Sequence, residues 1–304
     1  WEKVTAGGLP GYDLMVLKLT NAAIPGPKPI LFVNAAIHAR EYTTAELVTR
    51  FAEQLVAGYG VEADATWLLD FHEIHLLLQT NPDGRKQAEA GDLWRKNTNG
   101  NYCGATSSSR GADLNRNFSF QWSCCGGSSA SACSDTYHGP SPASEPEVQA
   151  LQSYLLSIFP DQRADTFPGG AAPEDATGVY LDIHSFSDLV LWPWGGTPTT
   201  TGNDAAFTAL GRRFAWFTGY IPEQAIDLYA TDGTTIDFAY GNLGVAALTF
   251  ELGNAFFESC SSFEASVLPT NLGALRYAAK VARTPYLTPG GPEARDLALT
   301  PLAI

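Results

Sequence analysis

Short runs of apolar residues alternate with longer amphipathic segments along this chain. The runs have the length and the β-branched content of buried strands, and they lie at residues 14–19, 30–34, 74–79, 179–183 and 245–250. Strands that alternate with helices usually pair into a parallel or mixed sheet that helices cover on both faces. The pattern therefore predicts a single α/β domain with a mixed, mostly parallel, twisted sheet.

Helical periodicity fills the segments between the runs. Residues 42–57 place apolar side chains at the spacing of one helix stripe. Ser144 and Glu147 resemble a capping box, which predicts the start of a second helix. Further helices are predicted over 204–218 and 270–283.

The C-terminal end of the chain has a different composition. Residues 285–292 contain three prolines and two glycines, a content typical of a linker. We therefore expect one folded domain over residues 1–284, followed by a Pro/Gly-rich linker or tail over residues 285–304.

Charge and hydropathy argue against two classes of partner. The chain has 32 acidic and 18 basic residues, a formal net charge of -14, and no cluster of Lys and Arg that could neutralise phosphates. No apolar run approaches the roughly 18 to 20 residues that a membrane-spanning helix needs. We therefore expect neither a nucleic acid nor a membrane as partner. The first residue, Trp1, is not an initiator methionine, which suggests a processed product.

Four of the five cysteines fall in one Gly/Ser-rich segment, residues 101–139; the full set is Cys103, Cys124, Cys125, Cys133 and Cys260. Disulfides restrict such a segment in the unfolded chain and occur mainly in exported proteins, so we expect a stapled loop and secretion. A zinc site is the less favoured alternative, because the adjacent pair lacks C-x-x-C spacing. The pairing stays open, and the odd number leaves a free thiol or an external partner.

Residues able to bind a metal follow three of the predicted strands. His38, His184 and Glu251 each lie at or just after the end of such a run. Because the carboxyl ends of parallel strands meet at one crevice, these side chains are expected to converge. His38 and Glu41 with a distant histidine would make the His, His and Glu set of a catalytic zinc site. An H-x-x-E motif alone is weak evidence, since a capping histidine and a helix-start glutamate also produce it.

A second histidine pair, His72 and His75, is rejected as a metal site. The two residues are three apart, whereas the histidines of the helical zinc-peptidase motif are four apart. On a strand their side chains would point to opposite faces.

Seven segments of the chain resemble, in the same order, those of the pancreatic-type zinc metallocarboxypeptidases of the A and B type. They are NAAIHAREY (34–42), TNPDGR (80–85), LWRK (93–96), GADLNRNF (111–118), CSDTYHGP (133–140), DIHSFSDLVLWPWG (182–195) and TFELG (249–253). The resemblance covers residues 11–283. It implies a secreted, bacterial-like zymogen product whose catalytic domain has a sheet of about eight strands. It also implies one Zn2+ per chain.

The resemblance assigns a role to each residue of the metal site. Those that would bind zinc are His38, Glu41 and His184. Glu251 would act as the general base for the water that attacks the peptide bond, and Asp113 would orient a ligating histidine.

Arg95 would be the second catalytic residue, and four further residues would bind the substrate. Arg95 matches an arginine that stabilises the oxyanion, and Arg40 matches a secondary carboxylate-binding arginine. Asn115 and Arg116 match a clamp for a terminal carboxylate, which the planar fork of arginine recognises with two parallel hydrogen bonds. Tyr229 matches the tyrosine that closes over the bound peptide. The expected substrates are peptides with a free C-terminal carboxylate, and the expected state is a monomer.

The position of Ile236 bears on specificity. It matches a place at the pocket base where an apolar residue accompanies a preference for apolar or aromatic C-terminal residues. Leu191, Gly195 and Thr249 are the expected walls. Asp232 is a nearby carboxylate that could also admit basic residues. Because one methylene changes binding in an apolar pocket by only about 1 to 3 kcal/mol, broad selectivity is compatible with this pocket.

Two departures from the family pattern limit the transfer. Phe186 stands where pancreatic members have tyrosine, and the continuation GNAFFESC (253–260) differs from theirs, so the outer subsites are not inferred.

Two alternative functions stay open. One is an amidase or peptidoglycan peptidase with the same zinc site, against which Arg116 argues. The other is an inactive peptide-binding module, against which the complete set of ligands and Glu251 argues.

Overall fold

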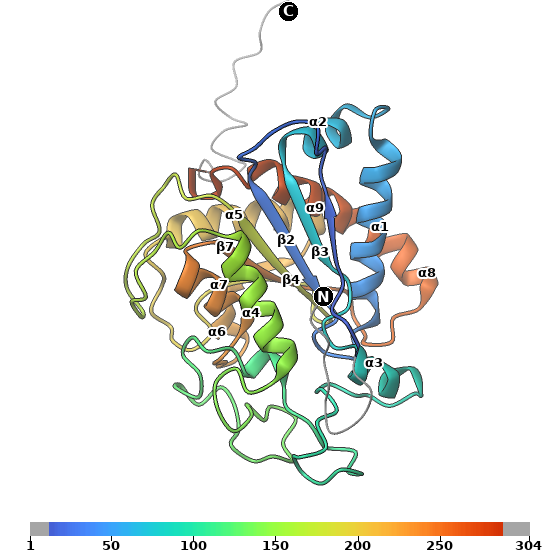
Figure 1. Cartoon of the computed structure of the whole chain (residues 1–304), viewed down its shortest axis with the longest axis vertical. Coiled ribbons are helices and arrows are strands. Elements are labelled where there is room, and N and C mark those ends of the chain that lie inside the picture. Colours follow the sequence, from blue (N-terminus) through green and yellow to red (C-terminus); the bar gives the residue numbers. More distant parts are fainter. Residues whose placement is uncertain (1–11, 288–304) are drawn as a thin grey trace, which may run out of the picture.

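Seven strands form one mixed sheet in the part of the chain that the structure, a computed structural model, describes, residues 12–287 (Figure 1). In chain order they are β1 (Val16–Leu19), β2 (Ile30–Ala35), β3 (Glu73–Leu77), β4 (Val179–His184), β5 (Leu189–Trp192), β6 (Ile221–Gln224) and β7 (Ala246–Glu251). Across the sheet the order is β1-β3-β2-β4-β7-β5-β6. The pairs β1/β3 and β5/β7 are antiparallel and the others are parallel. The predicted mostly parallel α/β sheet is confirmed, with seven strands in place of about eight.

Helices cover both faces of this sheet. They are α1 (Tyr42–Gly58), α2 (Ala63–Phe71), α3 (Pro82–Glu89), α4 (Pro146–Ile158), α5 (Asp204–Thr218), α6 (Ala225–Leu228), α7 (Thr235–Leu243), α8 (Cys260–Ser262) and α9 (Leu268–Val281), with the 3-10 helices η1 (Leu114–Arg116) and η3 (Pro285–Leu287) and the π-helix η2 (Phe263–Val267). In Figure 1, α4 and α7 lie in front of the sheet, and α5 and α9 pass behind it. Helices α1 and α9 contact each other and both contact β2.

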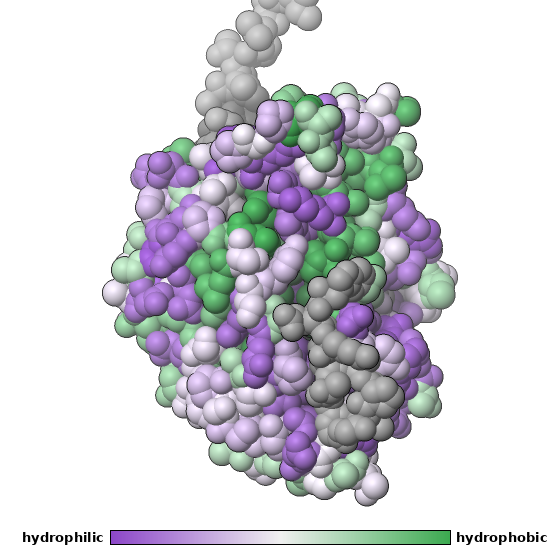
Figure 2. All heavy atoms as spheres, viewed as in Figure 1, coloured by the Kyte–Doolittle hydropathy of each residue, from purple (hydrophilic) through white to green (hydrophobic). Residues whose placement is uncertain are grey.

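The core lies between the sheet and its helices. Phe32 of β2 stacks on Tyr180 of β4 with ring centroids 5.6 Å apart, and neither side chain is exposed. On the face shown in Figure 2, apolar surface also gathers beside α4 and the edge strand β1, around Leu14, Val16 and Tyr154. No helix among the described residues is both long enough and apolar enough to cross a membrane.

Helix α4 begins in a different way from the one predicted. The prediction of a capping box is wrong. Glu145 is the N-cap residue, its side chain makes no cap hydrogen bond, and Pro146 occupies the first turn. The Ser144 hydroxyl instead donates to the Glu145 carboxylate (2.9 Å). Proline defines this helix start because its fixed φ fits the first turn and its missing N–H is not needed there.

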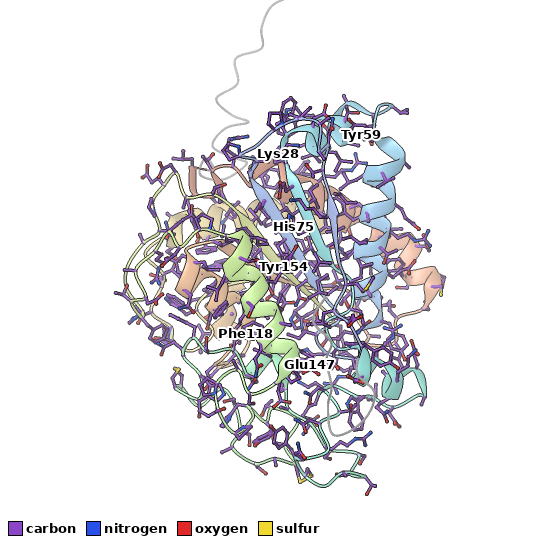
Figure 3. All side chains as sticks on the ribbon, in the orientation of Figure 1. Lys28, Tyr59, His75, Phe118, Glu147 and Tyr154 are labelled. Carbon is purple, nitrogen blue, oxygen red and sulfur yellow. A yellow bond between two sulfur atoms is a disulfide. The ribbon has the colours of Figure 1, made fainter. Side chains whose placement is uncertain are left out.

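The rejected histidine pair has structural roles. His75 of β3 contacts the hydroxyl of Tyr154 on α4 (Nδ1 to Oη, 2.7 Å), and Figure 3 shows the two side chains facing each other. His72 ends α2 and lies outside the strand. The two histidines therefore do not form a common site.

The cysteine-rich segment is stapled, as predicted. Cys103 is bonded to Cys133, and Cys124 is bonded to its neighbour Cys125. Cys260 is free and exposed.

The packed fold extends to Leu287. The Tyr286 hydroxyl donates to the Gly244 carbonyl (2.9 Å), and its side chain is buried. The first three residues of the expected linker thus pack on the domain as η3. The remainder of the expected tail, residues 288–304, lies outside the described residues.

Candidate active site

Neighbouring strand ends bring the metal-site residues together. Strand β2 ends at Ala35, and the following turn carries His38 and Glu41 to the start of α1. The adjacent strand β4 ends in His184, which is the register partner of Glu251 at the end of β7. The sheet therefore holds four chemically active side chains at its carboxyl edge, where crevices form in this fold class.

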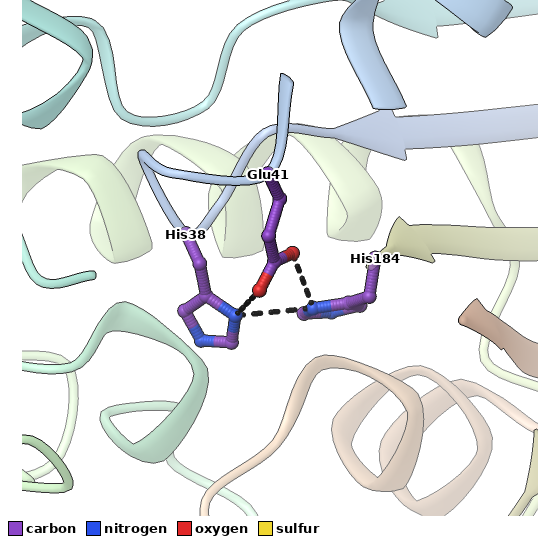
Figure 4. Close-up of side chains that lie close together, drawn as sticks. All are labelled: His38, Glu41 and His184. Carbon is purple, nitrogen blue, oxygen red and sulfur yellow. Dashed lines mark hydrogen bonds and ion pairs between the residues drawn. The ribbon is translucent and has the colours of Figure 1, made fainter. Parts of the chain in front are cut away.

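Two imidazoles and a carboxylate converge on one point (Figure 4). Nδ1 of His38 lies 2.8 Å from Oε1 of Glu41, and Nδ1 of His184 lies 3.1 Å from Oε2 of the same carboxylate. The two Nδ1 atoms are 3.1 Å apart. One ligand atom from each of these residues lies within 4.8 Å of the others. This donor set fits one zinc ion with a position left for water or substrate.

The opposite nitrogen of each imidazole is held by a buried carboxylate. Nε2 of His38 lies 3.1 Å from Oδ1 of Asp113, and Nε2 of His184 lies 2.9 Å from Oδ2 of Asp182. Such partners fix the ring orientation and leave Nδ1 for a metal. The sequence analysis identified Asp113 but missed Asp182. The signal was available, because residues two apart on a strand share a face.

The electrostatics of the cluster favour bound positive charge. Burial alone would raise the pKa of Glu41, but the imidazoles of His38 and His184 outweigh it and lower that pKa. Burial would lower the pKa of His184, but the carboxylates of Asp182 and Glu41 raise it well above its ordinary value. Metal binding at this cluster would therefore compete with protonation of the imidazoles.

The cluster opens onto a cleft of about 240 Å³. Its lining includes nearly all of the predicted substrate-binding residues, namely Arg40, Asn115, Arg116, Leu191, Tyr229, Ile236 and Thr249, and also Arg95 and Glu251. The exception is Gly195, which does not line the cleft. A Cβ there would lie 1.9 Å from Oγ1 of Thr231, so Thr231 forms that part of the wall.

Glu251 lies beside the ligand group and not within it. It lines the cleft, partly exposed, at the end of β7. Burial and, to a lesser extent, the Glu41 carboxylate raise its pKa to about 8, against the opposing effect of His184. A divalent cation in the cluster would favour the ionised carboxylate.

Arg95 is anchored to the same network. Its Nε and Nη2 donate to Oδ2 of Asp113 at 2.9 and 2.8 Å. Burial would lower the pKa of Arg95, but the carboxylates of Asp113 and Glu41 raise it. The guanidinium is therefore a fixed positive group beside the metal site, which is the requirement for stabilising an oxyanion.

The predicted carboxylate clamp faces the same cleft. Nδ2 of Asn115 lies 3.2 Å from Nε2 of His184, and Oδ1 of Asn115 accepts from the backbone of Thr235 (2.9 Å). Arg116 donates from Nε to the Gly127 carbonyl (3.1 Å). Tyr229 lines the cleft and is 51% exposed.

The outer part of the cleft contains an aromatic wall that the sequence analysis did not identify. Phe186 and Phe256 meet edge to face with centroids 4.8 Å apart, and the Arg40 guanidinium lies 4.1 Å from the Phe256 ring centroid. Phe256 lies in the segment that departs from the pancreatic pattern, so family resemblance gave no information about it.

Asp232 does not line the cleft. It is 1% exposed, and its Oδ2 accepts from the backbone N–H groups of Cys125 (3.1 Å) and Gly127 (3.0 Å). Its carboxylate is therefore not placed to meet a basic side chain in the pocket.

The donor set, the open cleft and the free carboxylate beside them are those of a zinc peptidase. The sequence profile of the zinc carboxypeptidases matches residues 8–265. The chain is 35% identical over 257 residues to a zinc carboxypeptidase of Saccharothrix mutabilis subsp. capreolus, covering 80% of this chain and 54% of that one. It is 31% identical over 256 residues to carboxypeptidase B of Astacus astacus, covering 80% and 75%.

The fold gives the same result. The crystal structure of thrombin activatable fibrinolysis inhibitor superposes with a TM-score of 0.76 at 25% identity, over 92% of this chain and 69% of that one. The chain thus belongs to the zinc carboxypeptidase family. It spans about half the length of the Saccharothrix relative.

Proposed function

We propose that this protein is a zinc-dependent carboxypeptidase that hydrolyses the last peptide bond of peptides with a free C-terminal carboxylate. The observation that carries the proposal is the arrangement of one cleft. The group formed by His38, Glu41 and His184, the carboxylate of Glu251 and the guanidinium of Arg116 all line it. A metal site beside a carboxylate receptor suits an enzyme that cuts next to a chain end.

Each residue of the site has a defined task in this reaction. His38, Glu41 and His184 would hold one zinc ion per chain, which when bound lowers the pKa of coordinated water to about 7 and polarises the substrate carbonyl. Glu251 takes a proton from the attacking water and delivers it to the leaving amine. Arg95, fixed by Asp113, stabilises the negative charge that develops on the carbonyl oxygen.

Binding residues set the direction of cleavage. Arg116, with Asn115, would hold the terminal carboxylate through charge-assisted hydrogen bonds. Arg40 would meet the same group on its way into the cleft, and Tyr229 would close over the bound peptide. A substrate that lacks the terminal carboxylate would therefore lack its main contact with the cleft.

The pocket supports a preference for apolar or aromatic C-terminal residues. Ile236, Leu191 and Thr249 line it with little exposed polar surface, and all three are at least nine-tenths buried. A basic side chain in this pocket would lose its hydration, and none of these three residues offers it a carboxylate, which is unfavourable. Secretion as a monomer completes the proposal, and the two disulfides support export.

Digestion of a defined peptide mixture, read by mass spectrometry, tests this proposal. The expected products lack single residues from the C-terminus, apolar and aromatic ones first, and a chelator abolishes their formation. Peptides with an amidated C-terminus serve as matched controls. Equal cleavage of the amidated and free-acid forms would contradict the proposal and favour an amidase with the same metal site.

A further inference from the structure

A disulfide between adjacent residues lies directly behind the substrate cleft. Cys124 and Cys125 are bonded to each other, with Cys124 exposed and Cys125 half-buried. Such a bond closes a small ring and removes backbone freedom from both residues. The segment that contains it, residues 124–127, is here called the disulfide loop. It makes contacts with two cleft-lining segments.

The first contact orients Arg116. Its Nε donates to the carbonyl of Gly127 in the disulfide loop (3.1 Å), and its Nη1 donates to the carbonyl of Asn115 (2.6 Å). A guanidinium has five N–H donors in a rigid plane, so these two bonds fix its orientation and leave donors for a ligand. The disulfide loop thus determines how Arg116 presents its fork to the cleft.

The second contact fixes the segment that follows Tyr229. The buried carboxylate of Asp232 accepts from the N–H groups of Cys125 (3.1 Å) and Gly127 (3.0 Å). Both donors belong to the disulfide loop, so their common direction depends on its shape. Hydrogen bonds to a charged acceptor are among the stronger ones in proteins. Asp232 directly follows Thr231, which lines the cleft.

Close packing joins the same parts. A Cβ added to Gly127 would lie 2.3 Å from Cα of Thr231, and one added to Gly196 would lie 3.0 Å from Sγ of Cys125. The disulfide loop therefore packs against Gly196 and against Thr231, which lines the cleft. A change in its shape cannot leave the positions of Thr231 and Asp232 unaffected.

We propose that the Cys124–Cys125 disulfide is a positioning element for substrate binding. In its oxidised form it holds the disulfide loop in the shape that orients Arg116 and anchors the segment carrying Tyr229. This inference rests on the proposed function. A dithiol reductant would open the ring: the S–S bond breaks, each cysteine sulfur gains a proton, and the dithiol closes to its own disulfide. The opened loop binds the terminal carboxylate less well.

The test is the double substitution Cys124→Ser with Cys125→Ser, which keeps the size of both side chains but cannot form the ring. For a blocked dipeptide with a free carboxylate we expect KM to rise about tenfold, equivalent to ~1.4 kcal/mol, with kcat within about twofold. Zinc content should not change. The calorimetric affinity for the amidated dipeptide should change less than that for the free-acid dipeptide. Cys260→Ser, which removes a free exposed thiol, is the matched control and should behave as the wild type.

A second variant keeps the disulfide and disturbs only the contact. Gly127→Ala places a methyl group against Thr231 and should raise KM in the same direction. If both variants fold with wild-type unfolding midpoints and keep KM within about twofold of the wild type, the inference is wrong. Loss of kcat and zinc at constant KM would also overturn it. Calorimetric binding of the free-acid dipeptide gives the same comparison without turnover, so an inactive wild type would count against the proposed function alone.

Discussion

Replacing Asp182 by asparagine tests whether its contact with His184 holds the metal site together. Asp182 is 0% exposed and accepts from three donors. Its Oδ2 faces Nε2 of His184 (2.9 Å) and the hydroxyl of Thr235, and its Oδ1 accepts from Nδ2 of Asn34 (2.7 Å). Asparagine has the same shape but replaces one oxygen with an NH2 group. One of these donors would then face another donor.

The expected loss is in zinc affinity. Removing such a partner of a ligating histidine weakens metal binding about 10- to 100-fold, or ~1.4 to 2.7 kcal/mol. Competition with a chromophoric chelator measures the zinc Kd directly. Glu147→Gln is the matched control, because it also replaces a buried carboxyl group with an amide but does not line the cleft. A zinc Kd within about threefold of the wild type in folded Asp182→Asn would show that packing alone orients the His184 ring.

Three other substitutions test separate parts of the molecule. Glu251→Gln should lower kcat by about 10²- to 10⁴-fold while zinc content and peptide binding persist, and full turnover would exclude Glu251 as the base. Arg116→Ala should raise KM for free-acid peptides by about 10- to 150-fold, a loss of ~1.5 to 3 kcal/mol, and an equal effect on amidated peptides would contradict its role. Burial raises the pKa of Glu147, labelled in Figure 3, to about 8, so the folded chain retains a proton that the unfolded chain releases above 4.5. The contribution of Glu147 to the free energy of unfolding is therefore complete below pH 4.5. It declines between that pH and pH 8 by about 1.4 kcal/mol per pH unit. Glu147→Gln should flatten this decline in denaturant titrations, and an unchanged slope would refute the assignment.

The convergence of the metal site could be predicted because it follows from strand order. His38 follows β2, His184 ends the neighbouring parallel strand β4, and Glu251 pairs in register with His184. A period of two along β4 also places Asp182 on the same side as His184, so that partner was within reach of the sequence. The sequence pattern was therefore sufficient to predict most residues of the metal site.

Features that depend on tertiary contacts were not predictable. Strands β5 and β6 have four residues each, and β6 includes Pro222 and Glu223, so neither shows the alternation of a longer strand. The bond between Cys124 and Cys125 could not be chosen over other pairings, because spacing alone does not determine connectivity. Phe256 reaches the cleft only through the fold of a segment without a family counterpart.

The position of Asp232 shows how three-dimensional placement changes a specificity argument. In the sequence it is only four residues from Ile236, near enough to suggest a receptor for basic side chains. In the fold its carboxylate turns to the amides of Cys125 and Gly127, while Ile236 faces the cleft. Because Oδ2 of Asp232 is bound to these donors and the residue does not line the cleft, its carboxylate is not placed to offset the desolvation of a lysine or arginine in the pocket. The position of Asp232 thus supports the proposed apolar preference, and the same carboxylate links the pocket wall to the disulfide loop.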